Sequence, residues 1–535
     1  MADRALAYIR SHPWLVAIAL GPVAALGYPP THAWWIALPA FAGLLALLRN
    51  APSARSAAWL GWLFGWSHLT LANNWIATAF THQAKMPEFL GWLAVPLLCL
   101  YLAVYPALAA LGAHLLAKRR GALGYTFIFA GLWILTEWLR SWAFTGYPWP
   151  PLGLMLLGGW ETPGAARLLP WMGTYALSGL AALLAGLLLY CVSARRWIAL
   201  VAGSATLIAL MFAPAFSDGP TQPASDRFAY RLVQPLLTQD EINDPTKFEE
   251  QFARITDLTL PGRDQSRLVL WPESAVPDYL EDGYPQRYYD RMTAGGDPVF
   301  ARKRIGGVIG PDATLLTGVV NLDFTEGDGI RRVVSARNSV LAIDGDGTIE
   351  GHYAKAHLVP YGEYLPMRQL LEPLGFRRLV AGSIDYLPGP GARTLDLGRH
   401  GKAGIQICYE IVFSGQVADR ANRPDYIFNP SNDGWFGMWG PPQHLAQARM
   451  RAIEEGLPVL RSTTTGISAV IDSRGVVLQT IPYGVADAIS GTVPAPASPT
   501  LFARTGNALA VGWAGLLLLI GFLLPRVLAL RRMRG

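Results

Sequence analysis

The distribution of apolar residues divides the chain into two kinds of sequence. Residues 1–215 are a succession of long apolar stretches separated by short polar loops, whereas residues 216–504 alternate between short β-rich runs and polar segments. A helix that crosses a bilayer needs roughly 20 mostly apolar residues. The first part therefore predicts a set of membrane-spanning helices, and the second predicts a folded domain outside the bilayer.

Eight apolar stretches are candidates for membrane spans, the shortest of them with support from its neighbours. They lie at residues 13–28, 34–48, 57–79, 88–117, 122–139, 171–192, 196–214 and 505–525. The composition, with 52% hydrophobic and 15% charged residues, is too apolar for an ordinary soluble enzyme. We expect a transmembrane domain of seven helices at 1–215, a catalytic domain at 216–500, and an eighth helix with a basic tail at 501–535.

Basic residues in the loops predict the orientation, because Lys and Arg near span ends gather on the cytoplasmic side. They cluster before the first span and after the second, fourth, sixth and eighth: Arg4, Arg10, Arg49, Arg55, Lys118, Arg119, Arg120, Arg195, Arg196, Arg526, Arg531, Arg532 and Arg534. Both termini are therefore expected in the cytoplasm, with the large insert outside. A cleaved signal peptide at 1–30 would fit the Arg-then-apolar order but not the later spans. The net charge of +6 lies in these short clusters, so no nucleic-acid partner is predicted.

The insert reads as an α/β layered domain of about 280 residues, because strands alternate with helices. Strands are expected at "FAYRLVQ" (228–234), "RLVLWPES" (267–274), "KAGIQICYE" (402–410) and "DYIFNPSN" (425–432). Hairpins are expected at 339–355 and 468–480, where turn residues separate alternating runs. Helices are expected at 246–258 and at 442–456, the second being amphipathic and ending at Gly456.

Cys408 is the only cysteine of the insert, since Cys99 and Cys191 lie inside apolar stretches. Outside the cytoplasm cysteines usually pair. Without a partner in its own domain, Cys408 is either a small buried hydrophobe or a nucleophile. Glu273 and Lys355 also follow predicted strands, where side chains can converge on one pocket. A carboxylate can take the thiol proton, and an ammonium can stabilise a thiolate and an oxyanion. The three are sufficient for acyl transfer through a thioester.

A cysteine–histidine pair is the alternative arrangement, with His352, His357 or His444 as the base. None of these histidines lies in a recognisable cysteine-protease context, so surface or core positions are expected for them. The sequence contains no HExxH motif, no paired CxxC and no glycine-rich phosphate loop. No metal or cofactor is therefore predicted.

Three stretches, "WPES", "KAHLVPYGEYLP" and "ICYE", resemble the signature stretches of the nitrilase superfamily of carbon–nitrogen hydrolases. "NPSNDGWFG" and "QARMRAIEEGLPVLRSTTTGISAVID" are also similar to it. The resemblance implies an α-β-β-α sandwich, with Glu273 as general base, Lys355 as oxyanion partner and Cys408 as acyl-accepting nucleophile. It also implies supporting roles for Glu363, Tyr409 and Glu410. The backbone N–H of Tyr409 is a candidate oxyanion donor.

The combination of eight spans with these stretches resembles the apolipoprotein N-acyltransferase family over nearly the whole chain, including "TGYPWPPLG" and "FARTGN". This resemblance implies a phospholipid sn-1 acyl donor, a diacylglyceryl-cysteine apolipoprotein as acceptor, and a thioester on Cys408. It also implies a bacterial inner membrane and a periplasmic catalytic domain, and we expect a monomer. The family commonly has an Asn-Ile-Pro-Gln stretch and then a tryptophan after its first "VQ", whereas this chain reads "VQPLLTQDEIND".

Two outer stretches are apolar enough to contact lipid. Residues 367–382 mix arginines with Leu370, Leu371, Leu374 and Phe376, a composition suited to the headgroup boundary. Residues 434–442 contain Trp435 and Phe436 among glycines, which is consistent with a mobile lip over the pocket. The alternative is that both stretches pack on the domain.

Two other functions compete with acyl transfer. One is a membrane-tethered amidase or nitrilase, in which water takes the acyl group. The other is a transporter or assembly scaffold with a degenerate hydrolase domain, whose spans should then carry buried charges. Glu137, near a span end, and His114 are the only near candidates for such charges.

Overall fold

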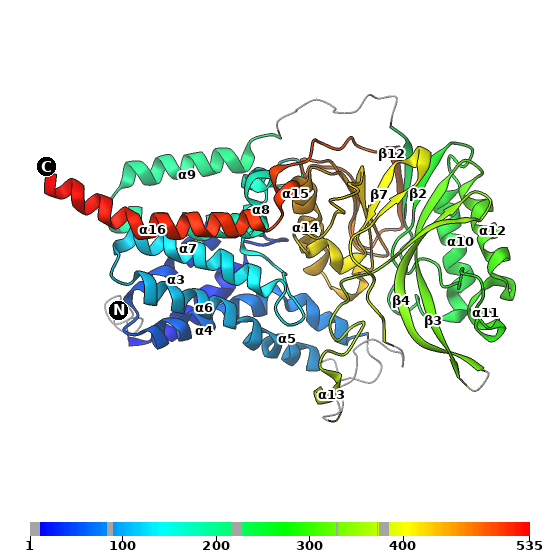
Figure 1. Ribbon diagram of the computed structural model, residues 1–535, viewed down its shortest axis with the longest axis horizontal. Coiled ribbons are helices and arrows are strands. Elements are labelled where there is room, and N and C mark those ends of the chain that lie inside the picture. Colours follow the sequence, from blue (N-terminus) through cyan, green and yellow to red (C-terminus); the bar gives the residue numbers. More distant parts are fainter. Residues whose placement is uncertain are drawn as a thin grey trace. The chain divides into compact units, whose positions relative to one another are not determined.

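The chain folds into two compact units, which Figure 1 colours along the sequence. The computed structural model describes residues 11–82, 89–215, 227–327, 330–371, 373 and 385–534. The helical unit contains Met1–Ala77, Pro87–Ala215 and Thr500–Gly535, and the sheet unit contains Thr78–Met86 and Phe216–Pro499. The predicted linker at 216–226 lies outside the described residues.

Helices occupy each of the eight apolar stretches. They are α2 Pro13–Ala25, α3 Trp34–Asn50, α4 Ala54–Ala72, α5 Phe89–Leu102, α6 Val104–Ala117, α7 Gly121–Arg140, α8 Leu169–Ser193, α9 Trp197–Phe212 and α16 Ala508–Arg534, with the short α15 Leu501–Thr505 before the last. Among the described residues, three helical segments are both long and apolar enough to cross a membrane: Phe89–Ala117, Gly121–Arg140 and Ala165–Ser193. The number of crossings stays a prediction.

Two of the predicted spans differ in detail. The third ends as an α-helix at Ala72, where the side chain of Asn73 donates to the carbonyl oxygen of Leu69 at 2.9 Å, and a 3₁₀ segment, Asn74–Phe80, follows. The fourth consists of two helices that meet at Ala103. Pro106 has no backbone N–H for the carbonyl one turn earlier, so the hydrogen-bond ladder is interrupted near this junction.

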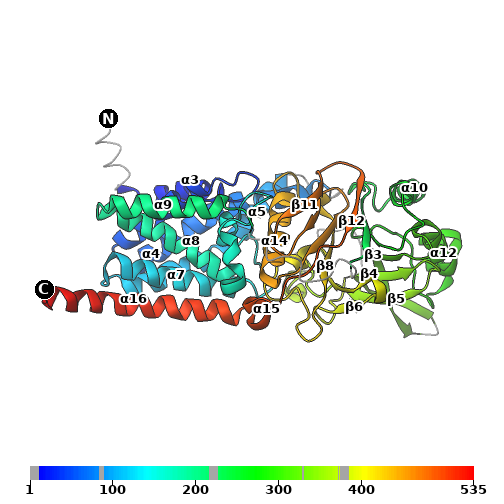
Figure 2. The same ribbon diagram turned by 90° about the horizontal axis from the view of Figure 1, so that it is seen from above.

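Helix α16 packs along helix α7. α16 lies beside α7 in both views, although hundreds of residues separate them in sequence (Figures 1 and 2). Glycines allow the close approach: a Cβ atom at Gly131 would lie 2.9 Å from the carbonyl oxygen of Ala514, and one at Gly521 would lie 2.6 Å from the side chain of Ile128. The helical unit is therefore built from both ends of the chain.

Residues 148–158, which follow α7, are a buried segment of the helical unit that is not α-helical and that contains the 3₁₀ turn Leu152–Leu156. The backbone N–H of Leu152 donates to Oε1 of Glu137 at 2.8 Å, and Nη2 of Arg140 donates to the carbonyl oxygen of Pro150 at 2.8 Å. Non-helical backbone in apolar surroundings needs such partners. Glu137 therefore has a structural role, which removes much of the support for the transporter alternative.

The sheet unit contains two six-stranded sheets. Their strand orders are β12-β1-β2-β3-β4-β5 and β11-β10-β9-β8-β7-β6. The first sheet contains β1 Ala229–Gln234, β2 Arg267–Leu270, β3 Thr314–Gly327, β4 Ile330–Asp344, β5 Ile349–Ala354 and β12 Asp487–Thr492. The second contains β6 Thr394–Asp396, β7 Lys402–Ile405, β8 Tyr426–Ser431, β9 Val459–Thr463, β10 Ser468–Ile471 and β11 Val477–Ile481. Both predicted hairpins are present, as β4–β5 and β10–β11.

The sheets and helices form four layers. One apolar core contains residues of both sheets, among them Leu232, Leu316, Ile405 and Phe428. A second core joins the other face of the first sheet to α10 Phe248–Thr259 and α12 Pro298–Ile309. α11 Gln286–Met292 is a shorter helix near α12, and α14 Gly440–Glu455 packs on strands β9 and β10 of the second sheet. The α-β-β-α sandwich expected from the resemblance is confirmed for this unit.

Two predicted elements of the sheet unit were wrong in detail. The strand expected at 402–410 ends at Ile405, and Cys408–Val412 is a 3₁₀ turn. The helix expected to be amphipathic is buried on all sides from Gln443 to Glu455, because its charged side chains find partners. Nε of Arg451 lies 2.8 Å from Oε2 of Glu454, for example. The helix does end at Gly456, whose φ of 66° is left-handed.

Candidate active site

Glu273, Lys355 and Cys408 come from the ends of three strands of the sheet unit. Glu273 follows β2 and Lys355 follows β5, both in the first sheet, whereas Cys408 follows β7 in the second. All three side chains are buried, with exposed fractions of 6%, 1% and 5%. The fold therefore gathers them in one enclosed place between the two sheets.

Lys355 is the cation of the site and lies among carboxylates. Its Nζ is 3.0 Å from Oε1 of Glu363 and 3.7 Å from Oε1 of Glu273. Burial alone would lower the pKa of Lys355, but the charges of Glu363 and Glu273 raise it well above its ordinary value. The side chain therefore carries a permanent positive charge, which suits a group that stabilises an oxyanion.

Asn338, on β4, connects the two carboxylates and was not singled out from the sequence. Its Nδ2 donates to Oε1 of Glu273 at 2.7 Å and to Oε1 of Glu363 at 2.9 Å. Its carbonyl oxygen accepts a hydrogen bond from the backbone N–H of Lys355 at 2.8 Å. Asn338 therefore fixes the positions of three site residues.

The other oxygen of Glu273 is held from the second sheet. Oε2 accepts a hydrogen bond from the backbone N–H of Asn432 at 2.7 Å. The side chain of Asn432 in turn donates to Gln239 at 2.9 Å and accepts from Thr464 at 2.9 Å. Gln239 belongs to the stretch "VQPLLTQDEIND", which departs from the family pattern, so this stretch still contributes to the site.

Cys408 lies at the start of the 3₁₀ turn with a φ of 51°. A residue other than glycine rarely adopts this left-handed conformation, and the surrounding structure must stabilise it. Burial raises the pKa of the Cys408 thiol well above its ordinary value, and the charge of Glu273 adds to this, whereas Lys355 opposes it. The resting thiol is therefore protonated at neutral pH, and a base is needed to activate it.

Glu410 joins the 3₁₀ turn Cys408–Val412 to the segment that carries Lys355. Its Oε1 accepts hydrogen bonds from the hydroxyl of Tyr353 at 2.8 Å and from the backbone N–H of Ala356 at 2.7 Å, and its Oε2 accepts one from the backbone N–H of Ile407 at 2.8 Å. Burial raises the pKa of Glu410 to about 7. Its place is consistent with a supporting role.

The other predicted site residues differ in their burial, and some of them lie outside the described residues. Tyr409 is buried, and its ring meets the ring of Phe413 edge-on at 5.1 Å. Leu370, in the short helix α13 Arg368–Leu371, is exposed. The side chain of Leu371, and Leu374 and Phe376 altogether, lie outside the described residues.

The stretch 434–442 is anchored at its first residues. The ring of Trp435 meets the ring of His82 edge-on at 5.8 Å, and the ring of Phe436 lies 5.6 Å from that of His444. Gly437 has a left-handed φ of 53°, and a Cβ atom there would lie 2.5 Å from Oγ1 of Thr78. Glycine is therefore required at this position.

The three histidines have surface or core positions, as expected. His352 is exposed on β5, and the ring of His357 stacks on the ring of Phe413 at 4.1 Å. His444 is fully buried, and its Nε2 lies 3.0 Å from the carbonyl oxygen of Cys408. Over the part of the chain that the structure describes, no group of three or more His, Cys, Asp or Glu residues could hold a metal ion.

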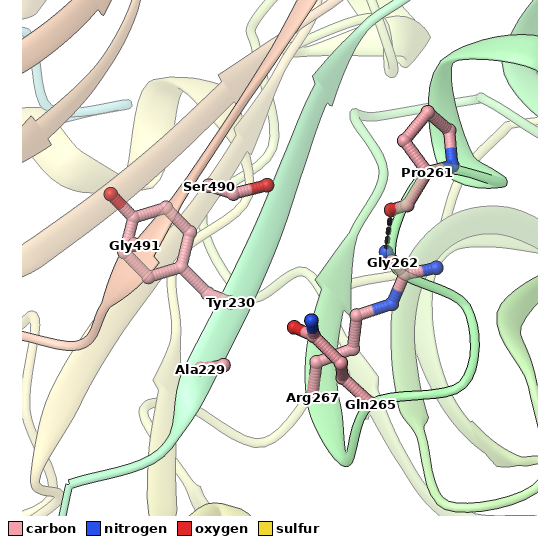
Figure 3. A pocket seen from close by; sticks show the side chains of 8 residues that line it. All are labelled: Ala229, Tyr230, Pro261, Gly262, Gln265, Arg267, Ser490 and Gly491. Carbon is pink, nitrogen blue, oxygen red and sulfur yellow. Dashed lines mark hydrogen bonds between the residues drawn. The ribbon is translucent and has the colours of Figure 1, made fainter.

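A separate pocket of about 280 Å³ lies at the amino ends of β1 and β2 (Figure 3). Glu273, by contrast, follows the carboxyl end of β2. The guanidinium of Arg267 lines this pocket and donates to the carbonyl oxygens of Pro261 and, at 2.7 Å, of Thr259. These carbonyls lie at the end of α10, so Arg267 stabilises a helix terminus. This pocket is not the candidate active site.

Two six-stranded sheets between helices, with Glu273, Lys355 and Cys408 at the ends of their strands, define a carbon–nitrogen hydrolase fold of the nitrilase kind. The family model described as carbon-nitrogen hydrolase matches residues 238–496, and that of the apolipoprotein N-acyltransferase N-terminal domain matches residues 20–187. The chain belongs to the apolipoprotein N-acyltransferase family.

Full-length relatives support this assignment. The apolipoprotein N-acyltransferase of Rhodopseudomonas palustris is 32% identical over 96% of this chain and 95% of its own length. That of Bradyrhizobium diazoefficiens is 34% identical over 94% of each chain. Among solved structures, Nit3 of Saccharomyces cerevisiae, a member of branch 10 of the nitrilase superfamily, is 18% identical and has a TM-score of 0.35, covering 52% of this chain and 93% of its own.

Proposed function

We propose that this chain moves the sn-1 acyl group of a phospholipid, through a thioester on Cys408, to the α-amine of an N-terminal diacylglyceryl-cysteine. The family assignment supports the acyltransferase activity. The observation that carries the mechanism is the buried cluster in which Lys355 lies 3.7 Å from Glu273 and its charge acts on Cys408.

In the first half-reaction, Glu273 takes the proton from Sγ of Cys408, and the thiolate attacks the ester carbonyl carbon. Lys355 and the backbone N–H of Tyr409 stabilise the oxyanion of the tetrahedral intermediate. The ester C–O bond then breaks, and the lysophospholipid leaves with the proton that Glu273 held. The acyl group remains on Cys408 as a thioester.

In the second half-reaction, the amine of the diacylglyceryl-cysteine attacks the thioester carbonyl. The amine passes a proton to Glu273, the C–S bond breaks, and Glu273 returns the proton to the thiolate of Cys408. The product is an amide, and the site is restored. The cycle is therefore ping-pong.

An acyl donor that lies in the bilayer gives the apolar helices a function besides anchoring the protein. Moving an acyl chain into water costs about 0.8 kcal/mol per CH₂ group, so a site that meets its substrate at the membrane avoids most of this cost. We propose that residues 367–371 and 434–442, the second stretch with Trp435 and Phe436, contact lipid near the site. We also propose an inner-membrane location, a periplasmic catalytic domain and a monomeric enzyme.

The decisive experiment incubates a synthetic diacylglyceryl-cysteine peptide with phospholipid in detergent and follows its intact mass. Wild type adds one acyl mass, whereas Cys408→Ser adds none and Glu273→Gln forms no thioester. Substantial activity in either variant would remove that residue from the mechanism. An unmodified peptide with folded wild type would reject the proposed substrates.

A tethered amidase or nitrilase is the second candidate, favoured only by the nitrilase-like unit. Incubated with phospholipid but without peptide, such an enzyme would release free fatty acid. Incubated with a small amide, it would release ammonia. An acyltransferase of the proposed kind stops at the acyl-thioester when the acceptor is absent.

A further inference from the structure

A fully buried cluster of three ionisable residues lies behind the nucleophile, and the mechanism above does not use it. Asp433, His444 and Arg461 all have an exposed fraction of 0%. Oδ1 of Asp433 is 2.9 Å from Nδ1 of His444, and Oδ2 accepts a hydrogen bond from Nη2 of Arg461 at 2.6 Å. The cluster joins the turn after β8, helix α14 and strand β9.

The histidine connects this cluster to the nucleophile. Nε2 of His444 lies 3.0 Å from the carbonyl oxygen of Cys408. A carbonyl oxygen can only accept, so Nε2 must carry the proton and donate it. The hydrogen bond therefore holds the backbone of the residue whose φ of 51° is otherwise unfavourable.

The cluster is also linked to the general base through adjacent residues of one turn. The backbone N–H of Asn432 donates to Oε2 of Glu273, and the next residue, Asp433, accepts from Nη2 of Arg461, which also lies 3.0 Å from Nδ1 of His444 and can donate to it. The turn leaves little room for adjustment, because a Cβ atom at Gly466 would lie 2.3 Å from Oδ2 of Asp433. The proton acceptor and the nucleophile are thus oriented by one turn.

Arg461 fixes this arrangement to the second sheet. Besides Asp433, its guanidinium donates to Oδ1 of Asn429 and, at 2.9 Å, to Oγ of Ser431, both on β8. Buried ions are costly, and apolar residues of similar volume often stabilise a fold as well or better. Stability alone is therefore a poor explanation for three such residues behind Cys408.

We propose that His444 is a positioning residue for Cys408, oriented by Asp433 and Arg461, which keeps the nucleophile turn in its left-handed conformation and Sγ beside Glu273 and Lys355. The inference rests on the proposed role of Cys408 as the nucleophile. Without the hydrogen bond from Nε2, the turn relaxes, and the thiol no longer meets its base in the reactive geometry.

The test uses full-length protein and two acyl donors, a phospholipid and a short-chain p-nitrophenyl ester. Acylation of Cys408 is measured by intact mass with either donor, and also as the burst of nitrophenolate with the ester. His444→Asn, whose amide is too short to reach the carbonyl of Cys408, should slow acylation by about 30-fold or more while the apparent KM changes less than about threefold. His444→Gln, whose amide N–H reaches the place of Nε2, should recover acylation to within about tenfold of wild type.

His400→Asn is the matched control. His400 is a buried histidine of the same unit, and its Nδ1 lies 2.9 Å from Oγ1 of Thr314. Its replacement should lower thermal stability but leave the acylation rate within about threefold. Asp433→Asn leaves His444 in place, so a partial loss of acylation rate is expected there, even if His444→Asn does not fold.

Wild-type acylation rates in folded His444→Asn or in Asp433→Asn would overturn the inference, as would an equal loss in His400→Asn. The two donors separate this result from a failure of the proposed function. If wild type is acylated by the p-nitrophenyl ester but not by phospholipid, the proposed substrates are wrong, and the burst rates still decide the role of His444.

Discussion

At the scale of single residues, the candidate site balances one cation against two carboxylates. Lys355 lies within 3.7 Å of both Glu363 and Glu273, and Asn338 donates to the same oxygen of each. An amide that donates to two carboxylates reduces their mutual repulsion and fixes the position of Oε1 of Glu273. The arrangement of Lys355, Glu363 and Glu273 therefore depends on the neutral side chain of Asn338.

Asn338→Ala should slow thioester formation by about 100-fold, because each hydrogen bond to a charged group contributes about 1.5–3 kcal/mol. The rate is measured by intact mass after mixing with phospholipid. Asn321→Ala is the control, since the buried Asn321 donates to Glu281 at 2.8 Å outside the site. An Asn338→Ala rate equal to that of the control would exclude this role.

Lys355→Met should make the Cys408 thiol harder to ionise. Lys355 lowers the pKa of Cys408, against the effects of burial and Glu273, so its removal leaves that pKa still higher. The thiolate fraction at a given pH then falls, and alkylation by iodoacetamide should be slower than in wild type from about pH 7 to about pH 10. Lys402→Met, at a partly exposed lysine of β7, should leave this profile unchanged. An unchanged profile in Lys355→Met would contradict the assignment.

At the scale of elements, the sequence pattern correctly predicted those elements that contacts between neighbouring residues stabilise. The hairpin β4–β5 was predicted because its turn residues Asp344, Gly345, Asp346 and Gly347 suffice to specify a reversal. The strand at β7 was predicted too long, because the apolar run continues to Ile407 while distant partners specify the turn at Cys408.

The same reason explains what the sequence missed in the site. Glu273, Lys355 and Cys408 could be chosen from their chemistry and from the resemblance of the stretches around them. Asn338 could not, and His444 was considered only as a possible base, since the contacts of each come from groups far away in sequence. α14 was expected to be amphipathic because its polar side chains are paired only in the folded unit.

The stretch 434–442 can be tested as an element through Gly437. Gly437→Ala combines left-handed strain with a Cβ atom 2.5 Å from Oγ1 of Thr78, so it should displace the stretch and abolish most acyl transfer to the peptide. Gly484→Ala is the control, because its φ of 73° brings similar strain, of about 1–2 kcal/mol, with no atom within 4 Å of the new Cβ. Full transfer by Gly437→Ala would argue against a role for this stretch.

At the scale of the whole molecule, the proposed topology predicts which surfaces meet which compartment. Lys303, on α12, and Arg55, in the first turn of α4, are both exposed and should lie on opposite sides of the membrane. In a Cys191→Ser background, Lys303→Cys should react with a membrane-impermeant maleimide in intact spheroplasts. Arg55→Cys should react only after lysis, and the reverse pattern would reject the orientation.

The packing of α16 against α7 has a consequence for how the protein is made. Gly131 and Ile128 receive their neighbours Ala514 and Gly521 only after residues 216–499 have been translated. At ~5–20 residues per second, that takes roughly 15 to 60 s. During this interval the nascent helical unit presents an unfilled face of α7, and α16 must find this face after it has been translated.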